Sequence, residues 1–290
     1  MAENLKNNFL GISQDLEKAR ILIASFGFEA TTTFGRGASK GPAAIIKASN
    51  QVELFDEELW QETYKKIGIA TLKTEKPAKT VDGAKKQIAK IILPILADKK
   101  FPVILGGEHS ITPFIIEAYK NAGYQDFSIL QFDAHADLRD GYLNQKYSHA
   151  AAMRRSLDFA DLNLAQIGVR NISNEDDELI FWEKNRDRIK TFFTKDKKNW
   201  KTDEITGALK ENVYLTFDVD AFDCSLMPST GTPEPGGLFW DETLEILRAV
   251  CQKKKIIGAD FVELAPIKGF HAPDFLAAKL IYKMIGYITK

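Results

Sequence analysis

The sequence predicts an α/β protein of three layers, in which helices cover both faces of a central, mainly parallel β-sheet. Short apolar segments typical of buried strands alternate with longer segments of helical periodicity. Few tight-turn sequences would join antiparallel strands, so we expect the strands to run parallel. The 290 residues contain no clear linker or internal repeat, and we expect one domain over 1–290.

The predicted strands are short apolar segments bounded by polar or turn residues. They are residues 20–26, 66–70, 101–105, 127–132, 165–169, 213–217 and 255–262. The predicted helices are residues 42–49, 81–97, 112–122, 175–186, 241–251 and the segment that follows Asp274.

Helix ends are predicted from capping residues and prolines. Thr112, Asp241 and Asp274 are of the types that cap helix N-termini. Pro94 is expected to bend or end the helix over 81–97, because proline lacks the backbone N–H that an interior helical position needs.

The charge balance excludes some classes of partner. Lys and Arg number 39 against 40 Asp and Glu, a formal net charge of −1, which gives no reason to propose nucleic acid or an anionic membrane. The segment Met1–Asn8 lacks the features of a signal peptide, and the apolar stretches are too short to span a bilayer. We therefore expect a cytoplasmic protein.

Two other residue types are assigned no chemistry. Cys224 and Cys251 do not have the spacing of a metal-binding pair, so we interpret them as thiols without a role rather than as a disulfide or a nucleophile. Gly35, Gly37 and Gly41 are irregularly spaced and do not open a helix in a phosphate-binding pattern, so they indicate a flexible loop.

Polar residues with metal-binding chemistry cluster where predicted strands end. The carboxyl ends of parallel strands meet at one edge of the sheet, where ligands bind in such folds. A single Asp after a strand is usually a turn or cap residue, but the combined set predicts a metal site. Its members are His109, Asp133, His135, Asp137, Asp218 and Asp220.

Four carboxylates and two imidazoles in one cleft carry more negative charge than a site without cations tolerates. Two divalent ions resolve this repulsion. Oxygen ligands with two imidazoles suit Mn²⁺, while zinc, cobalt, nickel and iron stay open. Such a pair, roughly 3.5–4 Å apart, lowers the pKa of a bound water from about 15.7 toward about 7, which predicts hydrolysis of an electrophilic carbon.

Two further residues are candidates for the reaction itself. His149 is expected to move protons, because an imidazole accepts and donates them near neutral pH; a surface or capping role is the alternative. Glu263 follows a predicted strand and matches a guanidinium, with an ordinary ion pair as the alternative. His271 is interpreted as structural. Asp140, Asp223 and Asp260 are interpreted as supporting or turn residues.

Together these segments resemble the ureohydrolases, a family that includes arginase and agmatinase. The motifs that carry the resemblance are GGEHS at 106–110, DAHADLR at 133–139, SHA at 148–150, FDVD at 217–220, GTPEPGG at 231–237 and VELAP at 262–266. The resemblance implies an arginase-like fold, a centre of two Mn²⁺ ions and hydrolysis of a guanidino group to an amine and urea. It also implies a homo-oligomer, either a trimer or a hexamer.

The resemblance also implies roles for individual residues. His109, Asp133, Asp137 and Asp218 would bind one ion, and His135, Asp133, Asp218 and Asp220 the other, so that Asp133 and Asp218 bridge. His149 would transfer protons and Glu263 would hold the guanidinium, and we place Asp137 with them among the catalytic residues.

The substrate is predicted from two further positions. Arginases usually carry an asparagine where Arg139 stands, and residues 231–237 resemble the agmatinase form of this loop, so we predict hydrolysis of agmatine to putrescine and urea, a step of polyamine biosynthesis. Agmatine ends in an ammonium group, so either Arg139 points away or the substrate differs. Glu234 is a candidate for binding that ammonium. The chain departs from the family pattern at Cys224 and Ala150.

Other functions fit the same residues. Arginine, guanidinobutyrate and aminopropylagmatine are alternative guanidino substrates. A deacetylase-like amide hydrolase on a related fold would use one zinc ion and fewer carboxylates. A metal-binding homologue without catalytic activity is the third alternative.

Overall fold

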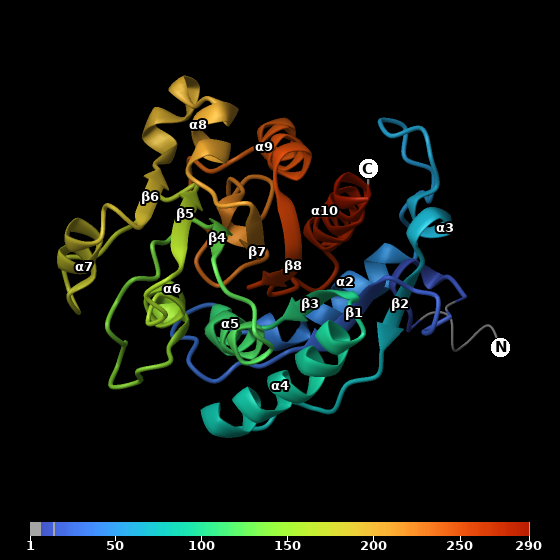
Figure 1. Ribbon diagram of the computed structural model, residues 1–290, viewed down its shortest axis with the longest axis horizontal. Coiled ribbons are helices and arrows are strands. Elements are labelled where there is room, and N and C mark those ends of the chain that lie inside the picture. The colour runs from blue at the N-terminus through green and yellow to red at the C-terminus, as the bar shows by residue number, and fades with distance from the viewer. Residues whose placement is uncertain (1–6, 14, 290) are drawn as a thin grey trace.

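Eight parallel strands form the centre of the computed structural model, which describes residues 7–13 and 15–289 (Figure 1). Their order in the sheet is β2-β1-β3-β8-β7-β4-β5-β6. The strands are β1 (Ile21–Phe26), β2 (Ile69–Leu72), β3 (Phe101–Gly106), β4 (Phe127–Phe132), β5 (Asn163–Ile167), β6 (Ile189–Phe192), β7 (Asn212–Asp218) and β8 (Lys255–Val262). Each pairing between them is parallel, which confirms the predicted fold class. Residues 1–6 of the segment predicted to lack a signal peptide lie outside the described residues.

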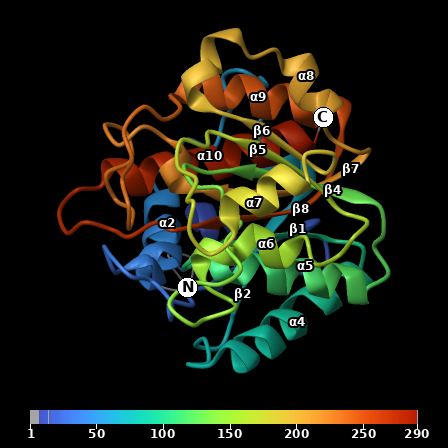
Figure 2. The same cartoon turned by 90° about the vertical axis from the view of Figure 1, so that its left-hand side faces the viewer.

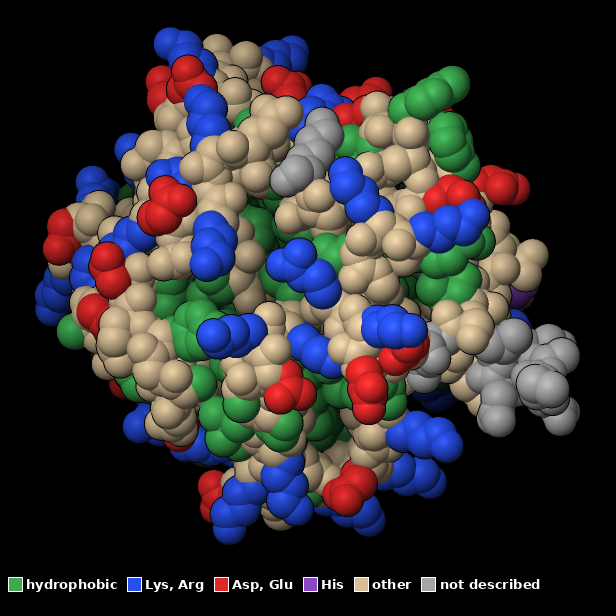
Figure 3. Space-filling view, turned by 45° about the vertical axis from the view of Figure 1, so that its right-hand side comes forward, with side chains coloured by type: hydrophobic (Ala, Val, Ile, Leu, Met, Phe, Trp, Pro, Cys, Tyr) green, Lys and Arg blue, Asp and Glu red, His purple; other side chains and the backbone are tan. Residues whose placement is uncertain are grey.

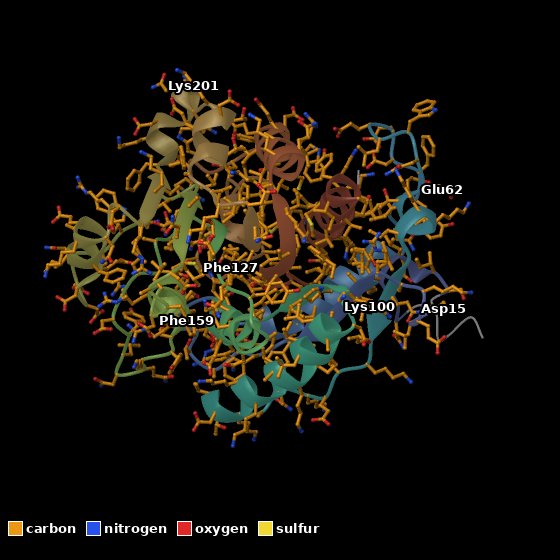
Figure 4. All side chains as sticks on the ribbon, viewed as in Figure 1. Asp15, Glu62, Lys100, Phe127, Phe159 and Lys201 are labelled. Carbon is orange, nitrogen blue, oxygen red and sulfur yellow. The ribbon has the colours of Figure 1, made fainter. Side chains whose placement is uncertain are left out.

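Helices cover both faces of the sheet (Figures 1 and 2). They are α2 (Gly41–Ser49), α3 (Thr63–Ile67), α4 (Val81–Ala97), α5 (Thr112–Asn121), α6 (Ala152–Ser156), α7 (Glu178–Lys184), α8 (Thr202–Gly207), α9 (Trp240–Lys253) and α10 (Ala272–Ile288). One apolar core joins the sheet to α2, α8, α9 and α10, and a second joins it to α4, α5 and α6. Side chains fill the space on either side of the sheet (Figure 4).

The strand order determines where the candidate site lies. After β3 the chain crosses to β4 in the other half of the sheet, and β7 and β8 later fill the gap between them. The four strands that precede the predicted site residues are therefore neighbours. Their carboxyl ends form the crevice in which sheets of this kind bind ligands.

Some element boundaries differ from the prediction. The strand expected at 66–70 begins at Ile69, because residues 63–67 form α3 and Gly68, at φ +72°, ends that helix. Pro94 does not end α4, which continues to Ala97. Pro94 is exposed, whereas Ile92 and Ile95 on the other side of the helix are buried and hold its last turn against the sheet.

The predicted caps were also wrong in detail. Thr112 lies inside α5, and its hydroxyl donates to Asp260 instead of capping the helix. Asp241 and Asp274 lie in the first turns of α9 and α10, whose N-caps are Phe239 and His271. Acidic residues in a first turn interact favourably with the helix dipole. Asp241 and Asp274 therefore still mark the starts of these helices, although they do not cap them.

Strand β5 begins and ends two residues before the predicted segment 165–169, and β6 was not predicted. Strand β6 is a short strand at the sheet edge in which only the two end residues are buried, so it lacks an apolar run. On the face that Figure 3 shows, Lys and Arg side chains are mixed with Asp and Glu. Among residues 7–13 and 15–289, each helix is too short or too polar to cross a membrane.

Candidate metal centre and active site

A cavity of about 420 Å³ opens at the carboxyl ends of the central strands. The site residues predicted from the sequence line it, except for His109 and Asp133, which are buried beneath it. Those that line it are His135, Asp137, Arg139, His149, Asp218, Asp220, Glu234 and Glu263. The fold therefore brings together residues from four strand ends and two loops.

His109 is the centre of a first group of possible metal ligands. Its Nδ1 atom lies 3.0 Å from Asp133 Oδ2, 3.0 Å from Asp137 Oδ2 and 3.6 Å from Asp218 Oδ2. This nitrogen is buried and makes no well-oriented hydrogen bond within the described residues. An unsatisfied imidazole nitrogen that faces three carboxylates fits a divalent cation.

A second group shares Asp133 with the first. His135 Nδ1 lies 3.0 Å from Asp220 Oδ2 and 3.6 Å from Asp133 Oδ1. The two oxygens of Asp133 thus face different histidines, as a bridging carboxylate requires. Asp218 lies at the edge of this arrangement, where its Oδ1 accepts the Asp220 backbone N–H at 2.8 Å.

The negative charge of the cluster shifts the pKa values of its members upward. Burial and the charge of Asp133 raise the pKa of Asp137 to about 7. Burial and the charge of Asp220 raise the pKa of Asp218 well above its usual value. Against the effect of burial, Asp220 and Asp133 raise the pKa of His135 to about 12. The cluster therefore holds protons that divalent cations would displace.

A hydrogen-bonded chain behind His109 sets the orientation of its ring. His109 Nε2 lies 2.9 Å from Thr216 Oγ1, which donates to Asp260 Oδ1 at 2.7 Å. Asp260 is fully buried and also accepts the Tyr214 hydroxyl at 2.7 Å. Asp260 is a supporting residue, as predicted, whereas Thr216 is not predicted. Its only signal in the sequence is a hydroxyl at the alternate strand position before Asp218.

A second polar chain, also missed, crosses the sheet behind Asp133. Gln131 Nε2 donates to Asp133 Oδ2 at 2.7 Å, Gln166 donates to Gln131 at 2.7 Å, and Thr191 donates to Gln166 at 2.7 Å. These side chains come from β4, β5 and β6, where they are in register. Gly168 permits a close approach, because a Cβ there would lie 2.9 Å from the Asp133 carbonyl oxygen.

Glu263 is fixed between the strand ends with its carboxylate at the cavity. Its backbone has φ +66°, rare for a residue with a side chain, and its N–H donates to the Gly107 carbonyl at 2.7 Å. Its Oε1 accepts the His109 backbone N–H at 2.6 Å. Burial and the nearby Glu108 raise the pKa of Glu263 well above its usual value, so a cation beside it would be bound favourably.

His149 begins a short 3₁₀ turn (His149–Ala151) and lines the same cavity. Burial and the nearby His135 lower its pKa to about 4. The ring of Tyr142 meets it edge-on with ring centroids 6.2 Å apart. His149 is therefore neutral at physiological pH and can accept a proton.

Arg139 does not present an unpaired positive charge to the cavity. Its Nη1 lies 3.0 Å from Asp176 Oδ2, and its guanidinium lies 4.7 Å from the centre of the Tyr142 ring. The expected repulsion of an ammonium group by Arg139 is thereby weakened. Glu234 also lines the cavity, and its backbone carbonyl accepts Arg170 Nη2 at 2.9 Å.

Asp223 holds the loop that contains Glu234. Its Oδ2 accepts the backbone N–H groups of Gly236 and Gly237, and these bonds help to lower its pKa to about 2 against the effect of burial. Asp140 accepts Arg155 Nη2 at 2.6 Å. These contacts agree with the prediction that Asp140 and Asp223 are supporting or turn residues.

The remaining residues singled out from the sequence lie outside the cluster. His271 is exposed at the start of α10 and belongs to neither group of possible ligands among the described residues. Cys224 and Cys251 are both free thiols, as expected, and burial raises the pKa of Cys251 to about 12. Ala150, where the chain departs from the expected motif, lines the cavity.

Comparison with known proteins identifies the relatives of this chain. The Arginase family model matches residues 19–286. N(1)-aminopropylagmatine ureohydrolase of Synechocystis sp. is 38% identical over 277 residues, 93% of this chain and 89% of that protein. Agmatinase of Pyrococcus horikoshii is 31% identical over 94% of this chain and 93% of that protein. The crystal structure of agmatine ureohydrolase of Thermoplasma volcanium covers 97% of this chain and 94% of that one, with TM-score 0.86 and 26% identity.

Proposed function

This chain belongs to the arginase family and is a ureohydrolase of the agmatinase type, and we propose that its substrate is N(1)-aminopropylagmatine, from which it releases urea. One observation carries the choice of substrate. Four relatives that are 34–38% identical over more than nine-tenths of this chain bear that name, whereas three relatives named agmatinase are 29–31% identical. Agmatine, predicted from the sequence, is the second candidate. The residues of loop 231–237 favour it.

We propose two Mn²⁺ ions as the cofactor. His109, Asp133, Asp137 and Asp218 would hold one ion, and Asp133, His135, Asp218 and Asp220 the other. The buried, unsatisfied Nδ1 of His109 and the two-sided contacts of Asp133 support this assignment. The ions would supply Lewis acidity and lower the pKa of a bound water toward about 7.

The remaining chemistry belongs to side chains around the cavity. Glu263, fixed by the His109 backbone N–H, would hold the guanidinium with its carboxylate. His149 is neutral and lines the cavity, so it would take a proton from water and return it to the amine that leaves. The carbon–nitrogen bond to the alkyl amine breaks, and urea and a protonated amine are released.

Charge at the outer wall of the cavity favours a cationic substrate tail. Glu234 lines the cavity, whereas Arg139 is paired with Asp176. The Glu234 carboxylate would attract the amines of aminopropylagmatine or agmatine and repel the carboxylates of arginine and guanidinobutyrate.

The proposal is tested by measuring urea release from these four compounds with manganese-loaded protein. We expect kcat/KM to be highest for aminopropylagmatine and next highest for agmatine. For arginine and guanidinobutyrate, kcat/KM should be at least about 10-fold lower than for agmatine, which corresponds to about 1.4 kcal/mol of transition-state stabilisation. A preference for agmatine over aminopropylagmatine would support the second candidate. Urea release from none of the four, with two ions bound per chain, would refute both.

A further inference from the structure

Glu108 lies outside the proposed metal ligands, yet its side chain is completely buried beside them. Its Oε2 accepts three consecutive backbone N–H groups, those of Ala30, Thr31 and Thr32, at 3.0, 2.7 and 3.1 Å. Its Oε1 accepts the hydroxyls of Thr31 and Ser110 at 3.0 and 2.5 Å. Every contact places a donor against an oxygen, so both oxygens act as acceptors. Burial raises the pKa of Glu108, and these hydrogen bonds oppose that rise.

Thr31 connects this carboxylate to the reaction cavity. Its Oγ1 accepts the backbone N–H of His149 at 3.0 Å and lies 3.0 Å from His149 Nδ1. A hydroxyl has one proton to donate and can accept two hydrogen bonds. Because both oxygens of Glu108 act as acceptors, the hydroxyl proton of Thr31 points to Oε1. The Nδ1 atom of His149, which also lies 3.4 Å from Ser148 Oγ, is then the donor to Thr31.

From this geometry we infer that Glu108, acting through the Thr31 hydroxyl, holds neutral His149 in the tautomer that carries its proton on Nδ1. Nε2 is then unprotonated and free to accept a proton. The inference rests on the proposed function, because a fixed tautomer matters only if His149 moves protons there. Glu108 and Thr31 are positioning residues, since neither is among the residues that line the cavity. The chain Glu108–Thr31–His149 parallels Asp260–Thr216–His109, in which a buried carboxylate and a threonine fix the other imidazole.

Two substitutions disturb the chain Glu108–Thr31–His149 in different ways. Thr31→Val removes the hydroxyl and leaves Nδ1 only the more distant Ser148 Oγ, at 3.4 Å. Glu108→Gln must keep an oxygen toward the three backbone N–H groups, so its amide NH₂ takes the place of Oε1 and donates to Thr31. The Thr31 proton then turns to His149 Nδ1, and the ring changes to the tautomer protonated on Nε2. Thr31→Ser keeps the hydroxyl and is the conservative variant.

The kinetic test compares kcat and KM for aminopropylagmatine in the manganese-loaded variants. Thr31→Val and Glu108→Gln are expected to lower kcat about 10- to 100-fold, the size of effect seen when a partner that orients a functional imidazole is lost. KM should change less than about 2-fold, and Thr31→Ser should restore kcat to within about 3-fold. Thr243→Val is the matched control, because Thr243 is also buried and donates its hydroxyl to a backbone carbonyl, but in α9.

The direct readout is the ¹⁵N spectrum of histidine-labelled protein loaded with diamagnetic Zn²⁺. The chain has 4 histidines, so each ring can be assigned. Wild-type His149 is expected to show a protonated Nδ1 and an unprotonated Nε2, and Glu108→Gln is expected to reverse them. A wild-type ring protonated on Nε2, or an unchanged tautomer and kcat in both variants, would overturn the inference. Absence of urea release from every guanidino substrate would instead refute the proposed function. The spectrum requires no substrate, so the two outcomes can be told apart.

Discussion

The Nε2 atom of His109 lies 2.9 Å from Thr216 Oγ1, on the side of the ring opposite the carboxylate cluster. The Thr216 hydroxyl donates to Asp260 and is therefore an acceptor for the Nε2 proton of His109. Nδ1 therefore faces Asp133 and Asp137, which raise the pKa of the ring well above its usual value against the effect of burial. The ring is thus oriented as a ligand before any ion binds, and an ion would displace the proton on Nδ1.

Replacing Thr216 by valine should weaken metal binding. The variant keeps the shape of the side chain but removes the acceptor for His109 Nε2, and loss of such a partner lowers metal affinity about 10- to 100-fold. Titration of metal-free protein with Mn²⁺ measures the change. The buried Thr243→Val is the control. Equal affinities for the wild type and Thr216→Val would mean that the chain behind His109 does not support a metal ligand.

Asp133→Ala should remove both ions and the activity together, because its two oxygens face different histidines. Metal content is measured by elemental analysis after desalting, and urea release is measured on the same samples. Asp196→Ala, at an exposed residue paired with Lys195, should retain both properties. Retention of two ions by Asp133→Ala would exclude a bridging role.

Metal uptake should release protons, and metal affinity should fall as the pH is lowered. Metal ligands must be deprotonated. Without metal, the pKa of His135 is raised to about 12, so its ring is charged at pH 8, and the pKa of Asp137 is raised to about 7, so lowering the pH to 6 adds a further competing proton. Calorimetric titrations in buffers with different ionisation enthalpies count the protons released at each pH. Binding heats that are independent of the buffer would contradict this assignment.

Glu234→Gln should raise KM for aminopropylagmatine and agmatine while kcat changes little, because Glu234 lines the cavity and is proposed to bind the substrate amine rather than to take part in the reaction. Loss of one partly exposed charge pair predicts an increase of about 2- to 5-fold. Glu53→Gln, at an exposed glutamate of another loop, provides the control. If KM is unchanged, Glu234 does not bind the substrate amine.

A stability prediction concerns Lys283 in α10. Lys283 and Asp56 are each only 2% exposed, and Nζ lies 2.9 Å from Asp56 Oδ1. Lys283→Met leaves this carboxylate buried without its partner, which should cost about 3–5 kcal/mol in the free energy of unfolding. Lys279→Met, whose Nζ is 3.9 Å from Glu57, should cost less than about 1 kcal/mol. Denaturant unfolding measures the free energy of unfolding of both variants. Equal losses would show that burial of the Lys283–Asp56 pair adds nothing to stability.

Much of the fold and the location of the cluster were predictable from local patterns. Buried parallel strands are continuous apolar runs, so β4 and β8 were predicted to the residue, and the polar residues that follow them had to share one edge of the sheet. Strand β6 was missed because an edge strand needs no apolar run. The start of β2 was misplaced because Gly68 ends a helix rather than continuing a strand.

The sequence by itself therefore determined the layered parallel fold and which carboxylates and histidines meet at its edge, because strand periodicity and strand direction are local properties of the chain. Only the tertiary structure decided their partners. Thr31 is 118 residues from His149, and Thr216 is 107 residues from His109. Hydroxyls that fix imidazoles across such separations leave no local pattern, because folding brings them together through the packing of whole strands and loops.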